Sequence, residues 1–486
     1  MNKYQILPLN FERFGQSTLL TNDAGEYLFV ETDKFEEFIQ HKLECNDSLY
    51  YDLKSKHFLC DNDKGLTQAI DMLATKYRTR KSFLSNFTSL HMMVVTLRCN
   101  QKCEYCQVSC EDSESYKYDM PQATAEKIVE YIFKSPSPNI KIEFQGGEPL
   151  LNWNAIVSTV NKANKLNTKH NKNLEYVLCT NLTLIDEEKL KFLKENNVYV
   201  SSSLDGPQDI HDFSRKLRTG GGTYHTYIEK LKLTRDILGF DKVSALMTTT
   251  SFSLNILNRV VEEYKTQGFD GIFLRALNPY GFAAENANSL GYNMHEFIDN
   301  YVDILNYIIN LNISGTHFVE YYTSLLTSRI FTPFSTGFVD LQSPSGAGIS
   351  GAIYDYNGDV YPADEARMLA RMGDEYFKMG NVFQDEYNAI FHGKVMKEVV
   401  SKSCLEILPG CSECVFKPFC GADPVRNYLE HRDIIGSRVN SPFCIKHKGM
   451  FKHIFSLINS NNKDILDVLW AWTTNRTLKE VQIENH

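Results

Sequence analysis

Three cysteines with a regular spacing, Cys99, Cys103 and Cys106, are the residues best suited to chemistry in this sequence. Their spacing is C-x3-C-x2-C, and three thiolates on one loop make a soft, anionic site that suits an iron–sulfur cluster or zinc. A closed zinc site or an ordinary cluster takes four protein ligands, so three ligands leave one metal position open. The alternative is a structural zinc loop whose fourth ligand lies elsewhere, for example Cys110.

A second cysteine set lies toward the C-terminus and contains Cys404, Cys411, Cys414, Cys420 and Cys444. The last four follow a C-x2-C-x5-C pattern with one later cysteine, which provides four ligands and no open position. A zinc ribbon has comparable spacing, so residue chemistry alone does not separate zinc from a cluster here. Cys404 is left over as a structural thiol or an alternative ligand.

Strand-like and helix-like segments alternate from residue 91 onward. The expected strands are residues 91–97, 140–144, 175–179, 198–204, 242–249 and 271–277, and the expected helices include 123–133, 186–195, 224–238 and 255–267. This alternation predicts parallel βαβ units with right-handed crossovers. Six units are too few for a closed eight-stranded barrel, so we expect an open, partial one.

Polar and glycine-rich segments follow several of these strands. The cysteine loop, Gly146-Gly147-Glu148 and Asp205-Gly206 all come directly after predicted strands. In parallel barrels the chemistry lies at the C-terminal ends of the strands. We therefore expect these three segments to converge.

Composition limits the class of protein. The length of 486 residues allows roughly two to four domains. A formal net charge of −9 argues against a nucleic-acid partner. No segment has the run of apolar residues that a membrane span needs, and the first residues lack a secretory-signal pattern. With no export signal, the 12 cysteines favour metal binding over disulfides and a cytoplasmic location.

The chain is expected to contain four parts. Residues 1–88 form an α+β module with a β-hairpin at 19–30 and a helix at 32–43, and residues 89–311 form the barrel. Residues 312–460 hold a hairpin at 352–361 and the second cysteine set, and residues 461–486 form a helical tail.

The first cysteine set, taken with Gly146-Gly147-Glu148-Pro149, resembles the radical S-adenosylmethionine (SAM) superfamily. In that family the three cysteines hold a [4Fe–4S] cluster, and the amine and carboxylate of SAM chelate the fourth iron. Tyr105 fits the family's preference for an aromatic residue before the third cysteine. The resemblance implies that Gly146 and Gly147 let the backbone approach SAM closely and that Glu148 accepts a hydrogen bond from its ammonium group.

The segment from Ser203 to Pro207, followed by His211-Asp212 and Arg215, resembles a run found in peptide-modifying members of this superfamily. The resemblance implies that Ser203 and Arg215 contact the SAM carboxylate or ribose, because an arginine can bond a carboxylate through two nitrogens. Asn181 is a looser candidate for the same pocket. For each of them the alternative is a solvated loop or a helix cap.

The second cysteine set resembles the auxiliary-cluster domain known as SPASM. The resemblance implies that one further [4Fe–4S] cluster is ligated by Cys411, Cys414, Cys420 and Cys444. Ser345 and Ala363 stand where the full pattern has two further cysteines, so we expect two clusters in total. Asp364 follows the second of these positions, where some SPASM enzymes have a general base; the alternative is a solvated carboxylate at the end of a hairpin. The expected fold is α/β: a partial (β/α)6 TIM-like barrel with a small N-terminal α+β domain and a cysteine-rich C-terminal SPASM/twitch-like domain.

Nearly the whole chain resembles the radical SAM peptide maturases of the His-Xaa-Ser system, through residues 20–30 and 410–427. The resemblance implies an enzyme that generates a 5′-deoxyadenosyl radical from SAM and crosslinks or oxidises residues of a ribosomally made peptide. A flavodoxin or ferredoxin would supply the electron, and the N-terminal module would bind a leader peptide by strand addition or act as a structural cap. The alternatives are an anaerobic sulfatase-maturase-like enzyme that forms formylglycine and a zinc-binding scaffold without catalysis.

Overall fold

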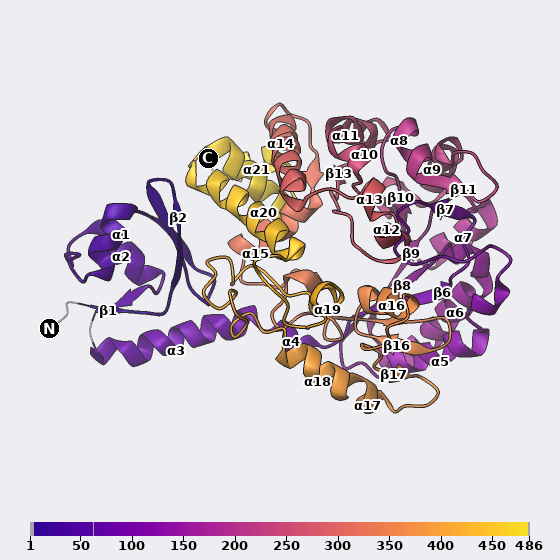
Figure 1. The fold of residues 1–486 in the computed structure, drawn as a ribbon, viewed down its shortest axis with the longest axis horizontal. Coiled ribbons are helices and arrows are strands. Elements are labelled where there is room, and N and C mark those ends of the chain that lie inside the picture. Colours follow the sequence, from indigo (N-terminus) through magenta and orange to yellow (C-terminus); the bar gives the residue numbers. More distant parts are fainter. Residues whose placement is uncertain (1–3, 62, 485–486) are drawn as a thin grey trace. The chain divides into compact units, whose positions relative to one another are not determined.

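A computed structural model describes residues 4–61 and 63–484 of the chain. The chain divides into two compact units (Figure 1). The first contains the described residues up to Ser85 together with Thr323–Gly346 and the segment from Ser401 onward, and the second contains Asn86–Tyr322 and Ala347–Val400. Each unit is therefore assembled from segments that are far apart in the sequence.

The second unit is built on an eight-stranded sheet with the order β12-β10-β9-β8-β6-β15-β16-β17. From β12 to β15 all neighbouring strands are parallel, and the last two pairings are antiparallel. The expected open α/β sheet is confirmed, and the hairpin predicted at 352–361 joins it beside β6. The strands are β6 (Leu90–Thr96), β8 (Asn139–Gly146), β9 (Asn173–Cys179), β10 (Val198–Ser203), β12 (Val243–Leu246), β15 (Gly351–Tyr354), β16 (Asp359–Tyr361) and β17 (Gly380–Asn381).

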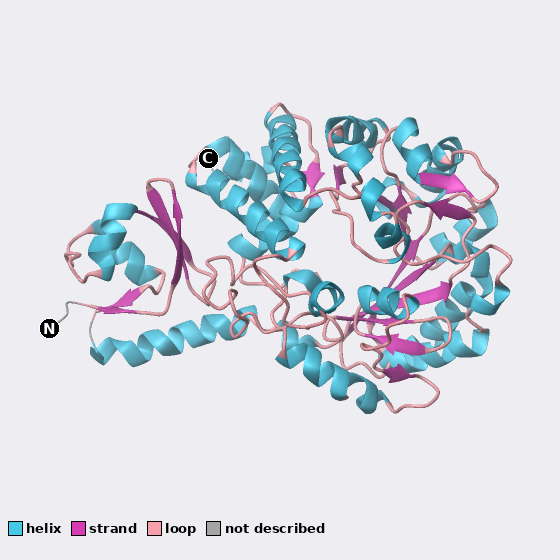
Figure 2. Ribbon diagram, in the orientation of Figure 1, coloured by secondary structure: helices cyan, strands magenta, loops and turns pink. Residues whose placement is uncertain are grey.

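Helices line the outer side of these strands (Figure 2). The predicted helix starts are confirmed at two places, because Pro121 directly precedes α5 and the Asp186 carboxylate accepts a hydrogen bond from Lys189 N (2.9 Å) at the start of α7. The helices of this unit are α5 (Gln122–Ile132), α6 (Trp153–His170), α7 (Glu187–Glu195), α8 (Gln208–Ser214), α9 (Tyr224–Leu238), α10 (Ser251–Leu254), α11 (Leu257–Thr266), α12 (Gly281–Glu285), α13 (Ala287–Leu290), α14 (Met294–Ile313), α16 (Asp364–Arg371), α17 (Tyr387–Phe391) and α18 (Lys394–Ser401).

The sixth predicted strand, 271–277, is much shorter in the structure. Only β13 (Gly271–Ile272) forms, and it pairs with β14 (Val319–Glu320) rather than with the large sheet. Beyond it, side chains take the backbone donors that a strand neighbour would have used. Leu274 N donates to Glu320 Oε1 (3.1 Å) and Leu277 N donates to the Tyr292 hydroxyl (2.8 Å). These contacts end the strand early.

The first unit contains a three-stranded antiparallel sheet made of β2 (Asn10–Phe14), β3 (Ser17–Thr21) and β4 (Tyr27–Glu31), followed by α1 (Thr32–Ile39). The predicted hairpin and the helix after it are confirmed. Leu20, Val30 and Phe35 meet in one hydrophobic core. The other elements are β1 (Gln5–Ile6), β5 (Leu59–Cys60), α2 (Ser48–Ser55), α3 (Asp63–Arg80), α4 (Phe83–Asn86), α15 (Tyr321–Phe331), α19 (Pro424–His431), α20 (Pro442–Asn459), α21 (Lys463–Thr473) and α22 (Leu478–Glu484).

Within residues 4–61 and 63–484, none of the helices combines the length and the apolar character needed to cross a lipid bilayer.

Candidate functional site

The cysteine loop that follows β6 is fixed by a short two-stranded sheet. Its strand β7 (Gln101–Cys103) pairs with β11 (Arg215–Leu217), and this register sets Arg215 opposite Cys103. At the start of the loop, Cys99 N donates to Glu111 O (3.1 Å). Two sequence candidates that lie more than one hundred residues apart are therefore neighbours.

The thiols of this loop lie together and include Cys110, which the sequence offered only as an alternative fourth ligand. The Cys110 thiol lies beside the Cys99 and Cys106 thiols, and Cys103 is near enough to Cys106 for the two thiols to affect each other's charge. Arg218 Nη2 also donates to Cys110 Sγ (3.4 Å). Burial raises the pKa of Cys103 to about 12, against the opposing effect of the nearby Arg215 guanidinium.

The Gly146-Gly147 pair is required by a close backbone approach. A Cβ atom on Gly146 would lie 2.1 Å from Thr96 O, and one on Gly147 would lie 2.2 Å from Arg98 O. Without side chains, this loop bonds the end of β6 directly, through Gly147 N to Thr96 O (2.9 Å) and Glu148 N to Arg98 O (2.7 Å). The glycines thus seat the loop after β8 against the residues that precede Cys99.

The Glu148 side chain is fully buried beside the cysteine loop. Its carboxylate accepts from Thr180 Oγ1 (2.7 Å), Asn181 N (2.8 Å) and Leu150 N (3.1 Å). Burial raises its pKa to about 7, although these three donors oppose the shift. A carboxylate has about four acceptor positions, so one remains for a further donor.

Asn181 lies next to the cysteine loop, whereas Ser203 ends the neighbouring strand. The Asn181 amide donates to Asn100 Oδ1 (2.9 Å), and Asn100 directly follows Cys99. Ser203 is the last residue of β10 and pairs with Leu246 of β12. Both candidates therefore lie at C-terminal strand ends, as expected.

Asp205 joins two of the candidates, whereas the sequence predicted only that its segment lies near the cysteine loop. Its carboxylate is 1% exposed and accepts from the Tyr105 hydroxyl (2.6 Å), Arg215 Nε (3.0 Å) and Thr248 N (3.3 Å). The Arg215 guanidinium also lies over the Tyr105 ring, 5.4 Å from its centroid. The signal for this role was an aspartate directly after a buried strand, where an isolated charge needs a partner.

Asp364 begins α16 and is paired with an arginine one turn later. Arg367 Nε donates to Asp364 Oδ1 (3.0 Å), and the Arg367 side chain is fully buried, with no acceptor for Nη1 within residues 4–61 and 63–484. The same guanidinium is electrostatically coupled to Cys106. Ala363, where the full SPASM pattern has a cysteine, is the residue before this helix. Asp364 and the cysteine loop therefore share one charged neighbourhood.

The four cysteines of the second set also lie together, in the first unit. Cys420 is coupled to Cys411, Cys414 and Cys444, and burial raises its pKa well above the ordinary value. Burial likewise raises the pKa of Cys411 to about 11, against the effect of Arg438 beside it. The fifth cysteine of the set, Cys404, has Glu406 and Lys81 as its charged neighbours.

Cationic side chains beside both cysteine sets fit an anionic, thiolate-bound cluster. Arg367 Nη1, near Cys106, and Arg329 Nε, near Cys420, are buried and have no hydrogen-bond partner in the part of the chain that the structure describes. Such groups are stabilised when an anion lies beside them. Across the described part of the chain, no group of three or more His, Cys, Asp or Glu side chains is arranged to hold a single metal ion. The cluster ligands thus stay predictions based on spacing and proximity.

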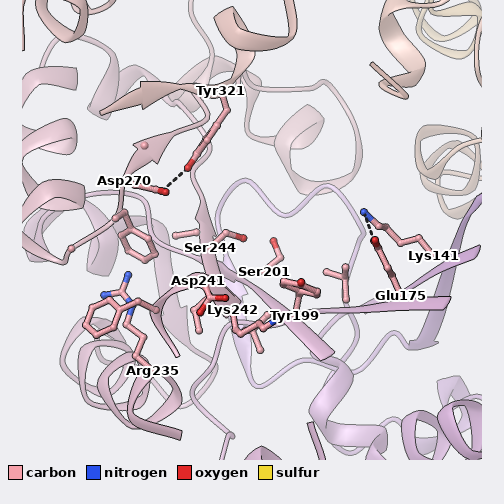
Figure 3. A pocket seen from close by; sticks show the side chains of 18 residues that line it. Lys141, Glu175, Tyr199, Ser201, Arg235, Asp241, Lys242, Ser244, Asp270 and Tyr321 are labelled. Carbon is pink, nitrogen blue, oxygen red and sulfur yellow. Dashed lines mark hydrogen bonds and ion pairs between the residues drawn. The ribbon is translucent and has the colours of Figure 1, made fainter. Parts of the chain in front are cut away.

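A cavity of about 620 Å³ lies along the sheet of the second unit (Figure 3). Among its lining residues, Lys141 Nζ lies 3.0 Å from Glu175 Oε2 and the Tyr321 hydroxyl donates to Asp270 Oδ1 (2.6 Å). The candidate residues named above are not part of its lining. The cavity uses residues of β8, β9, β10 and β12.

Comparisons with known proteins agree with the placement of the functional site at the cysteine loop after β6. Residues 93–254 match the Radical SAM superfamily model. The chain is 26% identical to a cysteine-type anaerobic sulfatase-maturating enzyme of Clostridium novyi, over 75% of this chain and 95% of the relative. It is 23% identical to a serine-type enzyme of Bacteroides thetaiotaomicron, over 78% of this chain and 92% of the relative.

Solved structures show the same fold. The structure of anSMEcpe with bound AdoMet has a TM-score of 0.64 at 22% identity and covers 77% of this chain and 99% of its own. Streptococcus suis SuiB bound to precursor peptide SuiA has a TM-score of 0.53 at 14% identity and covers 91% and 99%, respectively. Residues 93–254 are therefore a radical SAM domain, and the chain is a radical SAM enzyme homologous to the anaerobic sulfatase-maturating enzymes.

Proposed function

We propose that this enzyme is a maturase that removes a hydrogen atom from a residue of a ribosomally made peptide and leaves that peptide crosslinked or oxidised. The observation that carries the proposal is the meeting of the cysteine loop, the Gly146-Gly147 loop and Arg215 at the C-terminal ends of parallel strands. When bound there, SAM and a [4Fe–4S] cluster supply the 5′-deoxyadenosyl radical.

The residues of the chain position and protect that chemistry. Cys99, Cys103 and Cys106 would hold this cluster, and Cys411, Cys414, Cys420 and Cys444 would hold an auxiliary cluster, which would supply an acceptor for the electron left on the substrate. Asp205 fixes Arg215, which lies opposite Cys103 and would bond the SAM carboxylate. Glu148 keeps one acceptor position for an ammonium group while it anchors the loop after β8. Cys99, Glu148 and Asp205 are buried, and Cys103, Cys106 and Arg215 are half-buried, which limits the access of water to the reacting region.

Asp364 is proposed as the base that takes a proton from the substrate. Arg367 orients its carboxylate through Nε (3.0 Å) and Nη2 (2.9 Å). The nearby Cys179 thiol donates to Glu143 Oε1 (3.3 Å), and Asp364 acts electrostatically on that thiol. An oriented carboxylate near a polar sheet face is suited to accept a proton from a substrate side chain.

The proposed partners are a precursor peptide and a small electron-transfer protein such as flavodoxin or ferredoxin. Support for the peptide comes from two structures of the same fold, one of anSMEcpe with a Cp18Cys peptide and one of SuiB with precursor peptide SuiA. We place the enzyme in the cytoplasm, because the 12 cysteines of the sequence are all free thiols in the structure.

A second candidate function is oxidation of a cysteine or serine to formylglycine. The observation in its favour is that the chain matches 95% of the length of a cysteine-type sulfatase-maturating enzyme. Against it, Ser345 and Ala363 replace two cysteines of the full auxiliary pattern. The match to that enzyme also leaves a quarter of this chain without a counterpart, whereas SuiB covers 91%.

The test is an anaerobic reaction of reconstituted enzyme with SAM, a reductant and two kinds of peptide. A cysteine- and a serine-containing sulfatase peptide are compared with a precursor peptide encoded beside this gene. The proposal expects the precursor alone to lose hydrogen, detected by mass spectrometry. Exchange of SH2 for oxygen in the cysteine peptide, with no change in the precursor, would support formylglycine formation instead.

A further inference from the structure

Two arginines of the first unit are buried and have no carboxylate partner among the described residues. Arg80 and Arg329 are 5% and 6% exposed. Arg80 Nη2 donates to Arg329 O (2.8 Å) and to Pro418 O (2.9 Å), and Arg329 Nη2 donates to the same Pro418 oxygen (3.1 Å). Their acceptors are main-chain carbonyls, which carry no net charge, and no described residue provides an acceptor for Arg329 Nε.

The carboxylates near these arginines are already paired with lysines. The pairs are Asp23 with Lys417 (2.8 Å), Glu406 with Lys81 (2.6 Å) and Glu26 with Lys76 (2.6 Å). A small cavity between them is lined by four cationic and two anionic side chains. This region therefore holds an excess of buried positive charge, which is costly unless an anion lies beside it.

The group that can supply this anion is the second cysteine set. Cys420 lines the same cavity as Arg80 and Arg329, and Pro418, to which both arginines donate, lies two residues before it. The Arg80 guanidinium also lies over the ring of Phe419, 5.4 Å from its centroid. Burial lowers the pKa of Arg329 to about 10, and the nearby Cys420 sulfur opposes this shift.

We propose that Arg80 and Arg329 are positioning residues that raise the reduction potential of the auxiliary cluster held by Cys411, Cys414, Cys420 and Cys444. This inference rests on the proposed function, which assigns those ligands. An oxidised [4Fe–4S]2+ core with four thiolates carries a charge of about −2. One electron from a reduced donor makes it more negative, so two fixed cations stabilise the reduced form more than the oxidised form. The pair thereby favours electron acceptance by this cluster.

The test is a redox titration monitored by electron paramagnetic resonance on the full chain with Cys99, Cys103 and Cys106 replaced by alanine. In this background only the auxiliary cluster contributes to the signal. Arg80→Gln and Arg329→Gln remove charge but keep a hydrogen-bond donor, and Arg80→Lys and Arg329→Lys keep the charge.

Each Gln variant is expected to lower the equilibrium constant for reduction at least tenfold, which is ~59 mV for one electron. The Lys variants should stay within about threefold of the parent. The matched control is Arg13→Met, which removes a 58% exposed arginine of the same unit and should leave the potential unchanged. Iron content reports whether each variant still holds its cluster.

Three outcomes would overturn the inference. The first is Gln variants with the parent potential, and the second is an equal shift in the Arg13 control. The third is iron loss from both Gln variants while both Lys variants retain it, which would assign the arginines to cluster assembly. A parent background without iron would instead refute the ligand assignment in the proposed function.

Discussion

Replacement of Asp205 by asparagine tests whether this residue holds the candidate site together. The carboxylate is 1% exposed and lies 3.0 Å from Arg215 Nε, whose side chain is 12% exposed. The same oxygen accepts the Tyr105 hydroxyl at 2.6 Å. Asparagine has nearly the same shape but no charge, so Arg215 would be left buried without a counter-ion.

The expected loss is large because both partners are buried. Removal of one partner of a buried pair costs about 3–5 kcal/mol, out of a total stability that is typically about 5–15 kcal/mol. The matched control is Asp209→Asn, four residues further along the chain. Asp209 also pairs with an arginine at 3.0 Å, Arg259, but the two side chains are 58% and 49% exposed. Its removal should cost less than about 1 kcal/mol.

The assay is urea unfolding of the second unit, followed by the fluorescence of Trp153 on α6. Replacing Trp470 and Trp472 by phenylalanine leaves this tryptophan as the single one of the 3 in the sequence. SAM binding by the folded protein is measured in parallel by calorimetry and should be weakened in Asp205→Asn alone. Equal unfolding midpoints for the two variants, or an unchanged SAM affinity in Asp205→Asn, would refute the reasoning.

Three further predictions concern Glu148, the auxiliary cysteines and Asp364. The pKa of Glu148 is raised from 4.5 to about 7. Its contribution to the free energy of unfolding is therefore complete below about pH 4.5 and is lost as the pH rises through 7, a change of about 3 kcal/mol. Glu148→Gln should remove this pH dependence from the urea midpoints, and an unchanged pH dependence would contradict the assignment. Iron analysis should give about eight atoms per chain and about four after Cys414→Ala, whereas about twelve in the parent would exclude two clusters. Asp364→Asn should lower peptide turnover about 10²-fold or more without a change in SAM affinity, and full turnover would remove its role as a base.

The parts of the fold that the sequence predicted are those set by local pattern. The strand before Cys99 and the strand before Gly146 follow from short apolar runs, and both lie in the parallel sheet. The short β13 was not predictable, because its early end depends on Glu320, 46 residues after Leu274. A carboxylate that takes a backbone donor from so far away leaves no periodic signal.

The candidate site likewise has one part that local sequence pattern predicted and another part that it did not. Spacing along one loop identified the three cysteines, but the contact of Cys110 with Cys99 and Cys106 depends on how that loop folds back. The convergence of Arg80 and Arg329 on one carbonyl needs segments 249 residues apart in the chain. Burial and pairing of charges at such distances appear only in the folded structure.

The central claim is that this chain uses SAM at the first cysteine set to remove hydrogen from a peptide. The most direct measurement follows 5′-deoxyadenosine and peptide mass together in an anaerobic reaction, with the parent enzyme and with Cys99, Cys103 and Cys106 replaced by alanine. The parent should form 5′-deoxyadenosine and a precursor peptide that lacks two hydrogen atoms, and the variant should form neither. Equal 5′-deoxyadenosine formation by both proteins would contradict the claim.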